Sequence, residues 1–368
     1  MPVLPCPQTG RLKELRRLMA AAEVEAVLIT SAANRRYYSG FEAGDAMLDE
    51  SSGALLISKR GQYLLTDSRY TEAAKAEAPL FKVLTYRAGL GAELGKISAL
   101  GKIRDIYVEP EFMTIGVLSR LKRALPGHRF IPLPFDPDGP RAVKSPDEIK
   151  LVTKALMITE AAVAAALADI KPGRTERDVA FFIEAEFRRL GAEGPSFETI
   201  VASGPNGALP HAVPGFKKIK EGEMVIIDCG AKYRGYCADI TRTKIVGRPK
   251  PWQKEIYAIV RQAQLKAIAA IGPGVPASEV DAIARNHIGD QGYGEFFGHG
   301  LGHGVGLVIH EAPSLSPRNP RPLQPGEIVT VEPGIYLPGR GGVRLEQLVL
   351  VTDKGHKLLN RNLDFYDF

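Results

Sequence analysis

The chain has 368 residues, more than a single hydrophobic core usually holds, so its length predicts two domains. Its hydrophobic fraction of 45% and charged fraction of 24% are ordinary for a soluble globular protein and argue against a mainly disordered chain. The net charge is +6, but the one local basic cluster, at 217–220, lacks interleaved aromatic residues. We interpret this cluster as a solvated loop and expect no nucleic-acid partner.

The cysteine content and the hydropathy pattern bear on location. Cys6, Cys229 and Cys237 form no CxxC pair, and so sparse a set predicts a reducing compartment, the cytoplasm, rather than a disulfide framework. Cys229 and Cys237 lie in apolar stretches and are expected to fill the core. No stretch approaches the roughly 20 apolar residues of a membrane span, so we expect no membrane partner. Residues 1–10 lack the pattern of a signal peptide.

Residues 11 to about 135 alternate between helical and strand-like patterns, which favours an α/β layer domain. The predicted strands are 26–30, 53–58, 62–66, 82–86 and 106–109, and the predicted helices are 11–23 and 69–78. Five prolines between positions 132 and 146 then stiffen the chain and mark a linker. The predicted division is an N-terminal domain at 1–135, a linker at 136–146 and a second domain at 147–368.

The second domain opens with a helix-start signal. Ser145 is a good N-cap, Pro146 suits the first turn, and Glu148 completes a capping box. An alanine-rich helix is expected to run from there to about Ile170.

The second domain also contains an internal repeat. An Ile-Lys-Pro-Gly turn precedes a predicted helix at 175–190, and an Ile-Gly-Pro-Gly turn precedes another at 278–287. In each half an apolar strand then ends in an acid, Asp228 in the first and Glu332 in the second. Two such units packed face to face would bring these acids together at their interface, where clefts tend to form.

Four acids flank two predicted hairpins. Asp228 and Asp239 are symmetric about a turn at 233–234, and Glu332 and Glu346 are symmetric about Gly339. Residues opposite one another in an antiparallel hairpin have a constant sum of numbers, so each pair is expected on one face. Buried together, four carboxylates would have raised pKa values, and divalent cations are the natural compensation.

A glycine-rich segment supplies imidazole groups. His299, His303 and His310 lie within it, and its glycines let the backbone approach a ligand closely. Carboxylate oxygens with one imidazole suit manganese, cobalt, iron or zinc. A two-metal site can lower the pKa of a bridging water and clamp a tetrahedral intermediate. The other histidines would then donate to the oxyanion and handle the leaving amine.

Taken jointly, these segments resemble the pita-bread metallopeptidase family, which includes methionine aminopeptidases, Xaa-Pro aminopeptidases, prolidases and creatinases. The resemblance is strong over about 145–360 and rests on Ile-Asp228-Cys-Gly, Tyr-Cys-Ala-Asp239-Ile-Thr-Arg-Thr, Gly-His-Gly-Leu-Gly-His303-Gly-Val-Gly-Leu-Val-Ile-His310-Glu, Val-Glu332-Pro-Gly-Ile-Tyr and Val-Arg-Leu-Glu346. It implies an α+β fold, in which a duplicated pita-bread domain follows a smaller α/β creatinase-type N-terminal domain.

The resemblance implies a role for each residue of the site. Asp228 would chelate one metal ion, His303 and Glu332 the other, while Asp239 and Glu346 bridge both. The implied catalytic residues, which face the substrate or the reacting atoms, are His211, His299, His310 and Glu332. Tyr336 and Arg344 match residues that support the metals, and Gln347 departs from the pattern because an Asp often follows the bridging Glu.

The N-terminal region narrows the expected activity. Residues 34–41 and 65–73 look like the creatinase-type domain of proline-cleaving members. This implies an exopeptidase that cuts the Xaa-Pro bond with a metal-bridging hydroxide, two divalent ions (manganese or cobalt, with zinc or iron as alternatives) and a homodimer. The alternatives are a metal-free creatinase-type amidinohydrolase and a non-enzymatic binding relative. The sequence leaves open whether the enzyme is a dipeptidase or an aminopeptidase, and which first residue it prefers.

Overall fold

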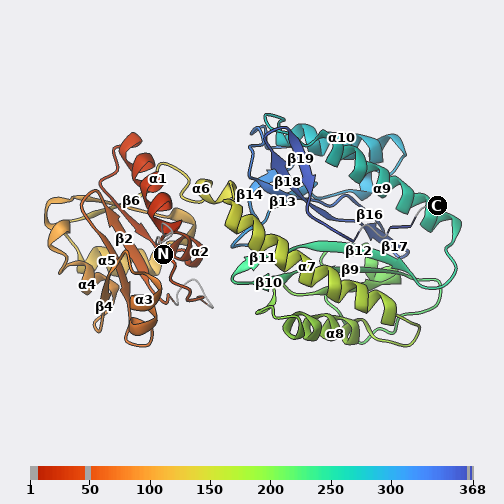
Figure 1. The fold of residues 1–368 in the computed structure, drawn as a ribbon, viewed down its shortest axis with the longest axis horizontal. Coiled ribbons are helices and arrows are strands. Elements are labelled where there is room, and N and C mark those ends of the chain that lie inside the picture. Colours follow the sequence, from red (N-terminus) through yellow and green to blue (C-terminus); the bar gives the residue numbers. More distant parts are fainter. Residues whose placement is uncertain (1–6, 46–50, 363–364, 367–368) are drawn as a thin grey trace, which may run out of the picture. The chain divides into compact units, whose positions relative to one another are not determined.

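The computed structural model describes residues 7–45, 51–362 and 365–366, and the chain divides into two compact units, Met1–Pro140 and Arg141–Phe368. In the first unit, six strands form one mixed sheet (Figure 1), and hydrogen bonds between neighbouring strands give the order β4-β3-β2-β1-β5-β6. These strands are β1 (Ala26–Ile29), β2 (Ala54–Ser58), β3 (Gln62–Thr66), β4 (Lys82–Thr85), β5 (Asp105–Val108) and β6 (Arg129–Pro132). The helices are α1 (Pro7–Ala21), α2 (Ala32–Ser39), α3 (Thr71–Glu77), α4 (Leu90–Leu94) and α5 (Ile115–Ala124).

The predicted alternation of strands and helices is thus confirmed in the first unit, but α2, α4, α5 and β6 were not predicted. The helix α2 has clear local causes. The Ser31 side chain accepts from the Asn34 N–H at its start, and Gly40, with φ of 90°, ends it by donating to the Arg36 carbonyl. The short helix α6 (Gly139–Ala142) follows in the proline-rich stretch.

The long helix α7 (Pro146–Asp169) begins as predicted. The Ser145 side chain accepts from the Glu148 N–H, the Glu148 side chain accepts from the Ser145 N–H, and the helix is capped at Ile170. By length and composition alone α7 could cross a membrane, which corrects the expectation that no stretch would qualify. Half of its most apolar window is buried inside the fold, as in the core helix of a globular domain.

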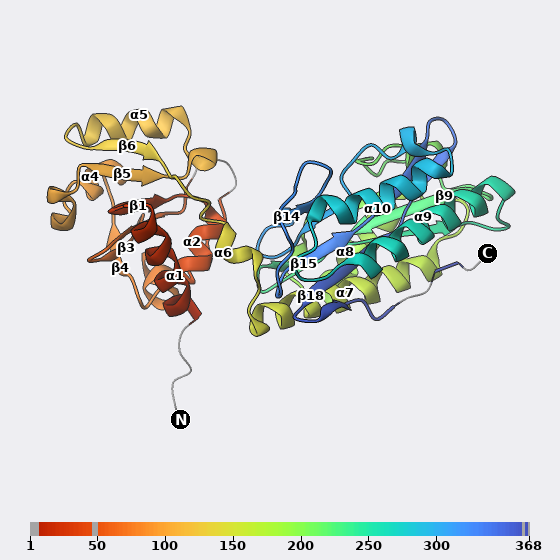
Figure 2. The same cartoon turned by 90° about the horizontal axis from the view of Figure 1, so that it is seen from above.

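The duplication predicted for the second unit is confirmed. The helix pair α7 and α8 (Glu176–Arg189) is followed by α9 (Pro251–Ala270) and α10 (Ala277–Asp290), and the strands lie between the two pairs (Figures 1 and 2). The first half contributes β7 (Gly194–Pro195), β8 (Ile200–Ser203), β9 (Met224–Cys229), β10 (Ala231–Tyr233), β11 (Tyr236–Cys237) and β12 (Ile240–Ile245). The second contributes β13 (Gly302–Gly304), β14 (Glu311–Leu315), β15 (Ile328–Val331), β16 (Gly334–Leu337), β17 (Gly341–Arg344), β18 (Gln347–Thr352) and β19 (Gly355–Leu358).

The predicted symmetry is wrong for the first hairpin. Asp228 pairs with Thr241 across β9 and β12, not with Asp239. The turn lies one residue later than expected, at Arg234 and Gly235, whose φ values of 45° and 71° suit a two-residue turn. The resulting shift of two residues equals the side-chain period of a strand, so Asp228 and Asp239 still face the same way.

The second hairpin has the expected register. In every pair between β16 and β17 and between β15 and β18, the two residue numbers have the same sum. A turn centred on Gly339 requires this. Glu332 and Glu346 therefore lie opposite one another, Glu332 in the link between β15 and β16 and Glu346 in the link between β17 and β18.

Candidate metal centre and its cavity

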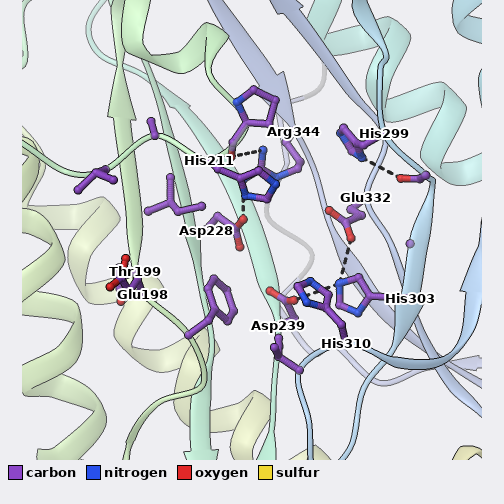
Figure 3. Close-up of a pocket in the computed structure, with 18 of the residues that line it drawn as sticks. Glu198, Thr199, His211, Asp228, Asp239, His299, His303, His310, Glu332 and Arg344 are labelled. Atoms are coloured by element: carbon purple, nitrogen blue, oxygen red, sulfur yellow. Dashed lines mark hydrogen bonds and ion pairs between the residues drawn. The ribbon is translucent and has the colours of Figure 1, made fainter. Parts of the chain in front are cut away.

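Asp239, His303 and Glu346 offer ligand atoms that all lie within 4.8 Å of one another. His303 Nε2 is 3.6 Å from Asp239 Oδ2 and 3.2 Å from Glu332 Oε1 (Figure 3). Asp228 lies on β9 and Asp239 just before β12, while the other three residues come from the second half of the duplication. The structure thus brings all five predicted ligands to one place.

The electrostatics of this cluster suit a cation. Burial, followed by the charges of Glu346 and Asp228, raises the pKa of Asp239, and burial with the Glu332 charge raises that of Glu346. Burial opposes ionisation of Glu332 as well, but hydrogen bonding to His303 lowers its pKa to about 2. Among the described residues, one buried oxygen each of Asp228, Asp239 and Glu346 has no hydrogen-bond partner. Hard, unpaired oxygens beside one imidazole fit a divalent metal.

Two threonine hydroxyls hold the carboxylates. Thr241 Oγ1 donates to Glu346 Oε2 at 2.9 Å, and Thr330 Oγ1 donates to Glu332 Oε1 at 3.1 Å while accepting from the His303 N–H. Neither threonine was predicted to belong to the site. A correct register for the first hairpin would have placed Thr241 beside Asp228 and so pointed to it.

A chain of hydrogen bonds leads from Asp228 to His299. Arg344 Nη2 donates to the Asp228 carboxylate, and Arg344 Nη1 donates to the Tyr336 hydroxyl at 2.9 Å. That hydroxyl lies 2.9 Å from His299 Nε2, while His299 Nδ1 faces the Gly300 carbonyl. Burial raises the pKa of Tyr336 to about 12 and lowers that of His299, so a neutral phenol donates to a neutral imidazole.

His310 and His211 approach the cluster from different walls. The His310 ring lies edge-on to the His303 ring with centroids 4.3 Å apart. Burial, and then the neighbouring His303, lower the pKa of His310. His211 is exposed on the loop after β8, next to Pro210, whose carbonyl accepts from Arg344 Nη1 at 3.3 Å.

One cavity of about 410 Å³, a size that suits a small peptide, is lined by four of the five predicted ligands, all but Glu346, and by His211, His299, His310 and Arg344. Its apolar wall was not predicted and consists of Phe197, Ile200, Val213, Pro214 and Ile309. In the sequence, the apolar residues near His211 and His310 are the one feature that points to this wall.

The three cysteines and Gln347 remain to be placed. Cys229 and Cys237 are buried and free, as expected of residues that fill the core. Burial raises the pKa of both thiols, that of Cys237 to about 11. Cys6 lies outside the described residues. Gln347 is fully buried, and its amide atoms have no hydrogen-bond partner among the described residues; nothing in the structure explains this departure.

Comparison with known proteins places the chain in a family. Metallopeptidase family M24 matches residues 150–353, and the creatinase/prolidase N-terminal domain matches 11–137. The chain therefore belongs to metallopeptidase family M24, and the predicted fold, a creatinase-type domain followed by a pita-bread domain, is confirmed. It is a peptidase of a metal-dependent family.

Its relatives resemble it over nearly their whole length. The Xaa-Pro dipeptidase of Pyrococcus horikoshii is 39% identical over 355 residues, covering 95% of this chain and 97% of that protein. The structure of an Xaa-Pro dipeptidase from Bacillus anthracis is similar with a TM-score of 0.90 at 40% identity, covering 96% of this chain and 98% of that one. The structure of an X-Pro aminopeptidase from Thermotoga maritima is similar with a TM-score of 0.86 at 38% identity, covering 95% of this chain and 97% of that one.

Proposed function

We propose that this protein hydrolyses the Xaa-Pro bond at the N-terminus of a peptide, with Xaa-Pro dipeptides as its main substrates. The observation that carries the proposal is the cluster of four carboxylates and His303, all but Glu346 in the wall of a cavity of about 410 Å³, with further histidines facing the same space. Relatives named Xaa-Pro dipeptidase, similar over almost the whole chain, support the specificity for proline.

The five clustered residues are proposed to hold two divalent metal ions. Asp228 would bind one ion, His303 and Glu332 the other, and Asp239 and Glu346 both. When bound, the ions would supply Lewis acidity and lower the pKa of the attacking water. Manganese or cobalt is expected, and zinc or iron would suit the same donors.

The remaining groups are proposed to act on the peptide. Glu332, which is ionised because its pKa is lowered to about 2, can accept the proton of the attacking water. His310 is neutral near pH 7 because its pKa is lowered, and its ring N–H can donate to the oxygen of the scissile amide. His211 on the opposite wall can orient the proline residue, and neutral His299 is positioned by the Tyr336 hydroxyl.

Product analysis under controlled metal loading tests this proposal. The purified chain is stripped with EDTA, reloaded separately with manganese, cobalt, zinc or iron, and offered Xaa-Pro, Xaa-Pro-Yaa and Xaa-Ala peptides. Release of free proline from Xaa-Pro, loss of activity with EDTA and no cleavage of Xaa-Ala are expected. Absence of turnover on every proline peptide by the metal-loaded protein would rule the proposal out.

An Xaa-Pro aminopeptidase is the second candidate, favoured by the structural similarity to the Thermotoga maritima enzyme. Faster release of the first residue from Xaa-Pro-Yaa than from Xaa-Pro would select it. The metal-free amidinohydrolase alternative needs no cluster of unpaired buried oxygens, and two equivalents of bound metal would exclude it. A homodimer in the cytoplasm remains our expectation, and light scattering tests the dimer.

A further inference from the structure

A buried ion pair lies directly behind the substrate-facing histidine. Glu311 follows His310 in the chain, and its Oε1 is 2.5 Å from the ammonium group of Lys144. Arg141 Nε is 3.8 Å from the other oxygen. The side chains of Glu311, Lys144 and Arg141 are only 3%, 1% and 4% exposed, so a buried carboxylate is matched by two cations.

The backbone is shaped to admit this carboxylate. Glu311 pairs with Gly304, the residue after His303, across β13 and β14. A Cβ atom added at Gly306 would lie 2.1 Å from Glu311 Oε1, so any side chain there would collide with the carboxylate. The glycines after His303 thus leave room for the Glu311 side chain beneath the segment that carries both histidines.

Lys144 is itself fixed by the same sheet. Its N–H donates to the Gly326 carbonyl at 2.9 Å, and its ammonium group donates to the Ala142 carbonyl at 3.1 Å. Val143 forms a bridge with Glu327, just before β15. The first residues of the second unit therefore reach the His310 segment through the charges of Lys144 and Arg141.

We propose that Lys144 and Glu311 are positioning residues, which hold His310 edge-on against His303 and so set its approach to the scissile amide. This inference rests on the proposed function for its catalytic consequence. A buried carboxylate that loses its nearest cation must shift toward water or another partner, and the adjacent His310 would move with it. The segment that enters the second unit would then control the geometry of the active site.

A second ion pair with a buried carboxylate, next to β15 of the same sheet, provides a matched control. Arg321 Nη2 is 2.6 Å from Glu327 Oε1, and the Glu327 side chain is fully buried. Removing Lys144 or Arg321 takes the nearest cation from a buried carboxylate, but of these two cations only Lys144 contacts the strand next to His310. The two variants Lys144→Met and Arg321→Met separate positioning from simple stabilisation.

The experiment compares these variants with Lys144→Arg in the full-length, metal-loaded chain. For Lys144→Met we expect kcat on an Xaa-Pro dipeptide to fall roughly 10- to 100-fold, with KM and bound metal nearly unchanged. Lys144→Arg should recover most of this loss, and Arg321→Met should lower Tm without changing kcat. If Lys144→Met does not fold, Glu311→Gln, which keeps the shape and removes the charge, is expected to give the same loss.

An activity-independent readout follows the histidines themselves. In metal-stripped, histidine-labelled protein, an NOE between the His303 and His310 rings should be present in the wild type and in Arg321→Met, and lost in Lys144→Met. Equal losses of kcat in the two methionine variants, or an intact NOE with unchanged kcat in Lys144→Met, would overturn the inference. A wild type without turnover would instead reject the proposed function, and the NOE comparison would still decide the positioning role.

Discussion

Thr241 joins the two halves of the proposed metal centre. Its hydroxyl donates to Glu346 Oε2 at 2.9 Å and lies 3.2 Å from Arg344 Nε, while the residue itself pairs with Asp228. One side chain from the first half thus orients a carboxylate of the second. Groups that hold metal ligands in this way typically change metal affinity when they are removed.

Substitution of Thr241 by Val should weaken metal binding about 10- to 100-fold, because it keeps the shape but leaves a buried Glu346 oxygen without its donor. Isothermal titration of manganese into the stripped protein measures this. Thr243→Val is the control, since the hydrogen bonds of the Thr243 hydroxyl within the described residues are to the backbone of Arg344, at 2.9 and 3.2 Å. Equal losses of affinity in the two variants would contradict the role given to Thr241.

The buried carboxylates predict how stability depends on pH. Burial and neighbouring charges raise the pKa of Asp239 and Glu346 in the folded, metal-stripped chain, but not in the unfolded chain. Between the ordinary and the raised values the folded state binds more protons, so its stability falls as pH rises. Glu332, with a pKa near 2, has the opposite effect only at lower pH, where its stabilisation is lost as it becomes protonated.

We therefore expect Tm of the metal-stripped protein to fall between about pH 5 and about pH 8, and Tm of the metal-loaded protein to stay nearly constant. Bound cations neutralise the same carboxylates, which removes the proton dependence. Differential scanning calorimetry with and without EDTA measures both curves. A stripped protein whose Tm rises across this range would show that these acids do not carry raised pKa values.

The strand β13 depends on close backbone contact. A Cβ atom at Gly302 would lie 2.0 Å from the Thr330 carbonyl oxygen, so Gly302→Ala must push β13 away from β15 and displace His303. We expect a loss of several kcal/mol in stability together with weaker metal binding. Gly298→Ala, in the same glycine-rich segment with nothing within 4 Å, should behave as wild type in urea unfolding and in metal titration.

The elements that could be predicted are those whose signal is local. The capping box of α7 and the turn at Gly339 are short-range patterns, and both are present in the structure. The predicted position of the first turn is wrong by one residue, because Arg234 adopts a positive φ, which is uncommon for residues other than glycine. Asp228 and Asp239 still lie on one face, as predicted, because a shift of two residues keeps a side chain on the same face of the strand.

The cavity wall was beyond prediction for a different reason. Phe197 precedes β8, Val213 lies on the His211 loop, and Ile309 precedes His310, so only the tertiary fold brings them together. Nothing in the spacing of these residues marks them as neighbours. The Lys144–Glu311 pair is hidden in the same way, because 167 residues separate its partners.

With the proposed ligands, the duplication would make metal binding a property of the whole second unit. Asp228 and Asp239 come from the half that contains β9 and β12, and His303, Glu332 and Glu346 from the half that contains β13, β15 and β18. A cation held by both sets stabilises the contact between the halves, and by mass action a ligand at 100 times its Kd adds about 2.7 kcal/mol of stability.

Removal of the metal should therefore loosen both halves together. Hydrogen exchange measured with and without EDTA is expected to accelerate in β9 and β12 and, to a similar extent, in β15 and β18. The sheet of the N-terminal unit serves as the internal control, because all five clustered residues lie in 141–368, and its exchange should not change. Acceleration confined to one half would mean that the ligands of that half alone hold the cation, which the pairing of Thr241 with Glu346 argues against.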